Sequence, residues 1–234
     1  MNTGDTAFMM ICAALVFFMT PGLAFFYGGL VRRKNVCNTI MACVAIMGLS
    51  VVMWTLFGYS LSFGGNHAGI IGDFRWFGLN GVGMEAGPYA DSIPHLVFCA
   101  FQMMFAMITP ALITGSLVGR MKFKALFLFV AIWSVIVYYP MAHMVWGDGG
   151  FLAAIGSVDF AGGDVVHISS GISALVLAII LGRRRGYEHT TYRIHNIPSV
   201  VLGASLLWFG WFGFNAGSAL KADGLAAVSY THLR

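Results

Sequence analysis

The chain has 234 residues, of which 59% are hydrophobic and only 9% are charged. Soluble domains carry about 25% charged residues, so this chain cannot cover a water-exposed surface and is predicted to be an integral membrane protein. The formal net charge of +4 does not indicate a nucleic-acid partner, because the basic residues form short clusters between apolar stretches.

Six stretches are long and apolar enough to cross a membrane, which takes about 20 residues. They cover roughly residues 6–31, 37–63, 93–119, 124–145, 161–182 and 197–218. Pro21 and Pro110 lie inside the first and third stretches, where we expect kinks and not helix ends. No basic segment precedes the first stretch, which also exceeds the apolar core of about 7–15 residues in a signal peptide. We therefore expect the first helix to be retained.

Charged residues alternate between the loops. The basic loops carry Arg32, Arg33, Lys34, Arg120, Lys122, Lys124, Arg183, Arg184, Arg185 and Arg193, and the opposite loops carry Asp73, Glu85, Asp91, Asp148 and Asp159 against Arg75 alone. The positive-inside rule predicts that the basic loops are cytoplasmic and the N-terminus is outside. The sequence thus predicts a multi-pass protein of the cell (cytoplasmic or inner) membrane.

His167 is the most informative residue of the fifth stretch. An ionisable side chain at hydrocarbon depth is costly, so we favour a neutral imidazole that is buried beside a narrow polar path over a histidine that only packs. An intramembrane hydrolase using Ser169 or Ser170 is a weak alternative, because both serines point away from His167 around the helix axis. The four cysteines and seven histidines show no metal-ligand spacing, so we expect no metal. We also expect no cofactor and no enzyme activity.

Two acidic residues lie before His167. Asp159 is expected to cap the helix, since a carboxylate can accept hydrogen bonds from the free amides at its positive end, and also to shape the field for cations outside. For Asp164 we expect an interhelical hydrogen bond. Small residues, mostly glycines, occur along the first, fifth and sixth stretches, where close helix packing alone explains most of them.

Several segments together resemble the ammonium transporter (Amt/Mep/Rh) family, in its bacterial and archaeal Amt branch. The resemblance covers about residues 7–227. It is carried by Phe25–Asn35 (FFYGGLVRRKN), Ala100–Phe105 (AFQMMF), His143–Gly147 (HMVWG), Asp159–Leu175 (DFAGGDVVHISSGISAL) and Trp211–Ser218 (WFGFNAGS).

The resemblance implies a homotrimer whose subunits each have eleven helices, arranged as two inverted five-helix repeats and a final helix, with a pore between the repeats. Residues 1–227 would be a partial membrane domain, with 1–185 as the first repeat and 194–227 as the start of the second. The fold class is therefore an all-α polytopic membrane protein with six helices. The second pore histidine would lie in the part that this chain lacks.

Site residues follow from the resemblance by motif position. Trp146, Phe105 and Ser218 would recruit ammonium at the outer face, with support from Asp159. Phe101 or Phe105 would form a hydrophobic gate with Phe214. His167 would line the lumen. Ammonium would lose its proton near the gate and pass as ammonia, with a separate proton path, and methylammonium would serve as an analogue.

Three expectations concern the limits of this chain. Residues 228–234 depart from the family pattern and are expected to be a non-native tail, so His232 is not a candidate ligand. The fragment alone is expected not to conduct. An ammonium sensor with a missing cytoplasmic signalling domain is the alternative function. The resemblance also suggests a PII-type signalling protein as a partner of the basic loops, although the role of these loops in setting the topology is enough to explain their charge.

Overall fold

The computed structural model describes residues 1–184, 187 and 191–231. Within them, six helical segments are long and apolar enough to cross a membrane, which confirms the predicted number of spans. They are Thr3–Leu30, Arg33–Phe63, His95–Leu117, Phe123–Ala154, Gly163–Leu181 and Ile197–Gly217. The chain is a multi-pass, essentially all-α membrane protein.

The six spans are built from shorter elements. The helices are α1 (Thr3–Leu30), α2 (Val36–Met53), α3 (Tyr59–Phe63), α4 (His95–Leu117), α5 (Phe123–Trp133), α6 (Tyr139–Trp146), α7 (Phe151–Ala154), α8 (Ser169–Leu181), α9 (Ile197–Gly217) and α10 (Gly224–Thr231). The strands β1 (Ala86–Gly87) and β2 (Ala90–Pro94) form a small antiparallel pair in the long loop. Both α1 and α4 continue through the prolines inside them, Pro21 and Pro110, as the sequence led us to expect.

Three π-helical turns lie within the spans, at Trp54–Gly58, Ser134–Tyr138 and Gly163–Ile168. The first joins α2 to α3, the second joins α5 to α6, and the third begins the span that contains α8. Two short 3-10 turns lie outside the bundle core, at Arg33–Asn35 and Phe77–Leu79. A π turn rotates the residues that follow it relative to a regular helix, so these turns decide which side chains face the bundle.

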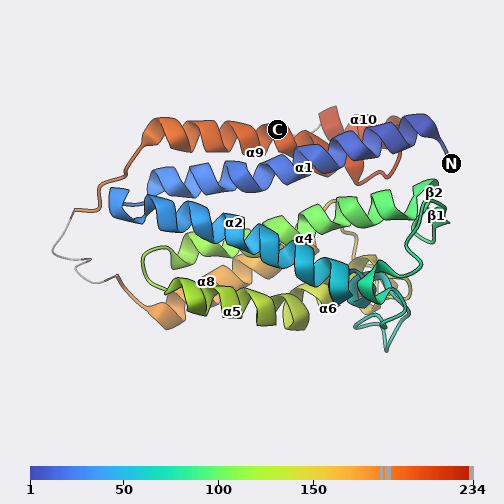
Figure 1. The fold of residues 1–234 in the computed structure, drawn as a ribbon, viewed down its shortest axis with the longest axis horizontal. Coiled ribbons are helices and arrows are strands. Elements are labelled where there is room, and N and C mark those ends of the chain that lie inside the picture. Colours follow the sequence, from blue (N-terminus) through green and yellow to red (C-terminus); the bar gives the residue numbers. More distant parts are fainter. Residues whose placement is uncertain (185–186, 188–190, 232–234) are drawn as a thin grey trace.

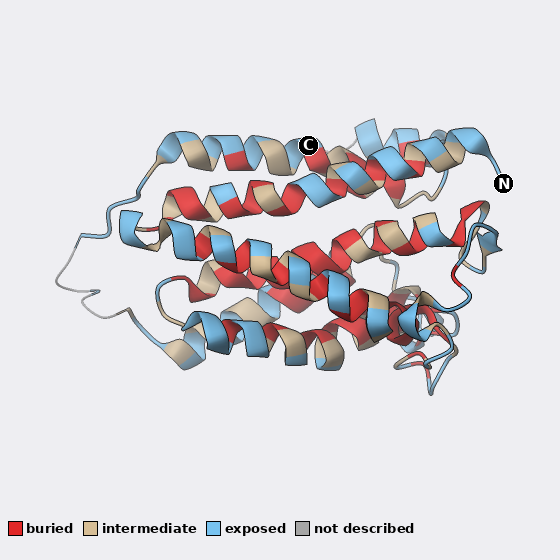
Figure 2. Cartoon of the chain, viewed as in Figure 1, coloured by how far each residue is buried: buried red, intermediate tan, exposed pale blue. Residues whose placement is uncertain are grey.

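The helices form an elongated bundle with α4 at its centre and α9 alongside α1 (Figure 1). Helix α4 contacts α1, α2 and α8, and it has the largest buried share of all six spans. The spans of α8 and α9 have the smallest buried share, and Figure 2 shows exposed residues along α9. The basic loops lie together at the end of the bundle opposite β1 and β2 (Figure 1).

Glycines let α1 and α9 approach closely. A Cβ atom on Gly203 would lie 2.3 Å from the backbone nitrogen of Phe26, and one on Gly22 would lie 2.9 Å from the Cβ atom of Leu206. Neither position could hold a larger side chain without moving a helix. The packing explanation for these small residues is therefore sufficient.

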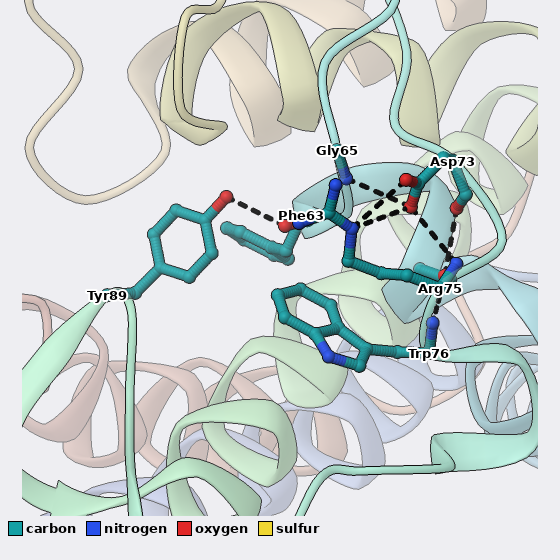
Figure 3. Close-up of polar contacts among 7 residues, drawn as sticks. Phe63, Gly65, Asp73, Arg75, Trp76 and Tyr89 are labelled. Atoms are coloured by element: carbon teal, nitrogen blue, oxygen red, sulfur yellow. Dashed lines mark hydrogen bonds and ion pairs between the residues drawn. The ribbon is translucent and has the colours of Figure 1, made fainter.

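The long loop that joins α3 to α4 is held by a compact polar cluster (Figure 3). The Asp73 carboxylate accepts hydrogen bonds from the amides of Gly65 and Arg75, both at 3.0 Å, and from the Arg75 Nε atom. Burial by itself raises the pKa of Asp73, but these hydrogen bonds and the Arg75 charge outweigh burial and hold the pKa below its ordinary value.

Candidate functional site

A cavity of about 390 Å³ opens at the end of the bundle that carries the long loop. Four of the residues predicted for the recruitment site line it together: Phe105, Trp146, Asp159 and Ser218. They come from α4, the end of α6, the segment before α8, and the end of α9. Residues more than 110 positions apart in the sequence thus meet at one site. The remaining lining residues are mostly aromatic or apolar: Phe63, Tyr89, Phe98, Gln102, Val145, Phe160 and Leu220.

Asp159 organises the start of the α8 span. Its Oδ1 atom accepts from the amides of Gly162 and Gly163, and its Oδ2 atom accepts from those of Asp164 and Val165. The carboxylate thus caps the helical segment, as predicted, although the residue at the cap position is Gly162, with φ of 118°. Because both carboxylate oxygens already accept backbone hydrogen bonds, Asp159 acts on the cavity mainly through its negative charge.

The backbone of Asp159 also orients Trp146. The indole Nε1 atom donates a 2.9 Å hydrogen bond to the Asp159 carbonyl oxygen. This contact fixes one edge of the indole at the cavity wall, with its ring centroid 5.8 Å from that of Phe105 in an edge-to-face arrangement. The two aromatic rings therefore present a preformed corner to the cavity, which suits a partly dehydrated cation.

Asp164 does not make the interhelical hydrogen bond that we expected. Its Oδ2 atom accepts a 2.6 Å hydrogen bond from the Ser157 hydroxyl, which belongs to the connection before the π turn. The expectation was wrong because this connection folds back over the start of the helical segment and supplies a nearer partner. Asp164 stabilises this connection locally.

Two polar side chains with acceptor oxygens, Ser218 and Gln102, line the cavity. The Ser218 hydroxyl donates its proton to the Phe214 carbonyl at 2.9 Å, so its oxygen is available to accept from a ligand. The Oε1 atom of Gln102 is buried and has no partner among the described residues. The sequence reading missed Gln102, although a single amide in an otherwise apolar span was a usable signal.

Aromatic rings continue from the cavity into the bundle. The ring centroids of Phe105 and Phe214 are 4.3 Å apart, and both side chains are buried. Phe101 contacts Phe105 edge to face at 5.0 Å and lies against Gly217. Of the two candidates left open for pairing with Phe214, the structure therefore places Phe105 in direct ring contact with it.

His167 lies at the far end of this row of rings. Its ring stacks on Phe214 with centroids 6.1 Å apart and lies 5.6 Å from Trp211. No hydrogen bond within the described part of the chain reaches its nitrogens, so both are available to a ligand or a proton. His167 is exposed, whereas the sequence led us to expect a buried imidazole, because none of the described helices covers this face of α8 and α9.

The serines after His167 do not form a nucleophile with it. The hydroxyls of Ser169 and Ser170 donate to the carbonyls of Val165 and Val166, at 2.5 and 2.6 Å. Such bonds to the preceding helical turn occupy the hydroxyl protons. The geometry therefore does not support the hydrolase alternative. Over residues 1–184, 187 and 191–231, no three His, Cys, Asp or Glu side chains are grouped to hold a metal ion.

Aromatic packing and hydrogen bonds hold Tyr89 in the wall of the cavity. Tyr89 stacks on Phe98 with an interplanar angle of 6°, and its hydroxyl donates a 2.8 Å hydrogen bond to the Phe63 carbonyl (Figure 3). The Tyr89 oxygen in turn accepts from the Asp148 amide at 3.2 Å. Burial raises the pKa of the Tyr89 hydroxyl, so it stays protonated and keeps donating.

Comparison with known proteins identifies relatives for this arrangement. Residues 7–232 match the model of the Ammonium Transporter Family. An ammonium transporter of Bacillus subtilis (strain 168) is 51% identical over 230 residues, which is 98% of this chain and 56% of that protein. The chain thus spans about half the length of the curated relatives it matches.

Solved structures give the same result. Candida albicans Mep2 is similar with a TM-score of 0.85 and 32% identity, over 97% of this chain and 50% of that one. A structure described as a sensor Amt protein has a TM-score of 0.86 and 30% identity, over 97% of this chain and 57% of that one.

Proposed function

This chain belongs to the ammonium transporter family, and from that membership we propose that the protein of which it forms part transports ammonium or ammonia across a membrane. The observation that carries the proposal is the cavity lined by Trp146, Phe105, Asp159 and Ser218, which leads to the Phe105–Phe214 pair. Relatives of the chain are named as transporters, which argues against an enzyme.

The cavity has the chemistry to bind an ammonium ion. The faces of Trp146 and Phe105 can each contribute about 0.5–2 kcal/mol of cation–π attraction. The oxygens of Ser218 and Gln102 can accept N–H bonds, which potassium cannot donate. Asp159 adds a favourable negative potential. Together these groups replace part of the water shell that the ion loses.

Beyond the cavity, we propose that the ion gives up its proton. The buried rings of Phe105 and Phe214 offer no hydrogen-bond partner, so the charged ion is disfavoured there while neutral ammonia can pass. The His167 nitrogens are the next polar groups along the row of rings, and we propose that they line the path and exchange protons. Potassium has no proton to lose and would be rejected at this step.

The exposed position of His167 supports the proposal that this chain carries only part of the pathway. We propose that a second half of the protein covers this face, adds a second histidine, and completes two inverted repeats in a homotrimer. In that assembly, residues 1–185 are the first repeat and 194–227 the start of the second, while 228–234 are non-native. The basic loops would then lie in the cytoplasm, available to a PII-type protein, with the N-terminus outside the cell membrane.

Uptake of labelled methylammonium tests the proposal. Cells that lack their own ammonium transporters would express either the complete reading frame or residues 1–234, with membrane insertion checked for each. We expect saturable uptake only from the complete protein. Saturable uptake by residues 1–234 would refute the proposal that this chain carries only part of the pathway. Absence of uptake by the complete protein, once it is shown to be in the membrane, would refute the proposal that the protein transports ammonium.

A sensor is the second candidate function, because a sensor Amt protein is among the structural neighbours. The same cavity would then bind ammonium to signal. A cytoplasmic signalling domain in the complete reading frame, with ammonium binding but no methylammonium uptake, would favour the sensor over the transporter.

A further inference from the structure

The end of the bundle that carries the basic loops contains a second cavity, of about 550 Å³. It lies between the α1–α2 connection, the α4–α5 connection and the α8–α9 linker. Its lining includes five basic side chains, Arg32, Lys34, Arg120, Arg183 and Arg184, together with Asn35 and Tyr192. No acidic residue lines it among the residues that the structure describes. Cationic groups from three separate loops therefore converge on one space.

The charges in this cavity are partly withdrawn from water. Arg32, Arg120 and Arg184 are all half-buried. The guanidinium groups of Arg32 and Arg184 lie over the ring of Tyr192, at 5.1 and 4.7 Å from its centroid. Like charges that share one aromatic ring repel each other, and an anion bound close to them offsets this repulsion. By sequence, the three loops hold ten Lys and Arg residues and one acid, Glu188, which lies outside the described residues.

Arg120 gives an independent indication of a ligand. One Nη atom donates to the Gly182 carbonyl at 2.7 Å and the other donates to the Ser116 carbonyl, so the side chain joins the ends of α4 and α8. Its Nε atom is buried and has no hydrogen-bond partner among the described residues. Buried donors in folded proteins almost always have an acceptor. Arg120 is itself one of the residues that line the basic cavity.

We propose that this cavity binds a phosphate group, supplied either by an anionic lipid headgroup or by a soluble phosphate. Phosphate offers several acceptor oxygens and negative charge, which match a cluster of arginines and a lysine. Basic pockets between membrane helices commonly bind lipid phosphates. The site is at the opposite end of the bundle from the aromatic cavity, and the proposal does not depend on ammonium transport.

Thermal unfolding of the whole chain in detergent micelles tests the proposal. The midpoint would be followed during titration with dioleoylphosphatidylglycerol, dioleoylphosphatidylcholine or sodium phosphate, because a ligand that binds the folded state raises it. We expect a saturable rise with phosphatidylglycerol, with sodium phosphate or with both, and none with phosphatidylcholine. A response to phosphatidylglycerol alone assigns the lipid source, and one to sodium phosphate alone assigns the soluble source. No saturable rise with either refutes the site.

Matched variants separate this site from general charge attraction. The cavity triple is Arg32→Gln, Lys34→Gln and Arg184→Gln. The control triple is Arg33→Gln, Lys122→Gln and Lys124→Gln, three basic residues near the same end of the bundle that do not line the cavity. We expect the cavity triple to weaken binding about tenfold or more, equivalent to about 1.4 kcal/mol, and the control to stay within about twofold. Equal weakening in both triples would overturn the proposal. If the cavity triple loses its helical circular dichroism signal, the single variants Lys34→Gln and Lys122→Gln are compared instead. We expect Lys34→Gln, an exposed position, to bind the phosphate ligand more weakly than Lys122→Gln, and equal binding would overturn the proposal.

Discussion

Replacing Asp159 should destabilise the fold through the start of the α8 span. The carboxylate accepts four backbone hydrogen bonds of 2.5–3.0 Å, and no other described side chain accepts from those amides. Loss of a helix cap costs about 0.5–2 kcal/mol, and loss of the charge at a partly buried helix N-terminus costs up to about 2 kcal/mol more. We therefore expect Asp159→Ala to lower the free energy of unfolding by about 1–4 kcal/mol, because all four amides lose their acceptor at once.

The conservative change Asp159→Asn refines this prediction. An asparagine keeps one acceptor oxygen but turns an amide group toward two backbone donors, so we expect about half of the loss seen with alanine. The measurement is unfolding of the purified chain in mixed micelles, followed by circular dichroism. Asp148→Asn is the control, because it removes the same charge from an exposed side chain and should stay within about 0.5 kcal/mol of wild type. A loss below about 0.5 kcal/mol for Asp159→Ala would refute the reasoning.

Three further predictions concern the long loop, the cavity and the helix packing. The lowered pKa of Asp73 means that its contribution to stability is complete above about pH 4 and is lost as the pH falls further. Asp73→Asn should therefore abolish this acid-dependent loss of stability. A pH profile of unfolding that is the same in the variant and the wild type would contradict this prediction. Gln102→Leu in the complete protein should raise the KM for methylammonium about fivefold, as expected for one lost neutral hydrogen bond, and an unaltered KM would show that its free oxygen does not face the ligand. Gly203→Ala should cost about 1–3 kcal/mol of stability through overpacking against Phe26, whereas Gly171→Ala, where an added Cβ meets open space, should cost nothing.

The fold was largely predictable from the sequence because a bilayer imposes strong rules on composition. Apolar length alone located all six spans, and the alternation of basic and acidic loops matches the way the basic loops gather at one end of the bundle. The family resemblance, confirmed by the match over residues 7–232, also singled out the four residues that share the aromatic cavity. Matching motif positions can indicate which residues share a site, even though the sequence gives no distances between them.

The details that escaped prediction depend on hydrogen-bond register and on three-dimensional neighbours. A π turn and an α-helix can have the same apolar composition, so the hydropathy of the sequence could not predict the π turn at Gly163–Ile168. The Ser157–Asp164 bond depends on how a connection folds back, and the contact of Phe214 with the ring of Phe105 depends on ring positions. The exposure of His167 depends on which helices are present to cover it.

The most direct test of the account measures recruitment at the aromatic cavity. In the complete protein, Trp146→Leu combined with Ser218→Ala removes one cation–π contact and one acceptor, worth together about 1–3 kcal/mol. We predict that the KM for methylammonium uptake rises at least about fivefold while the maximal rate at saturating substrate is largely kept. An unchanged KM in this double variant, with normal membrane insertion, would contradict the claim that ammonium enters through this cavity.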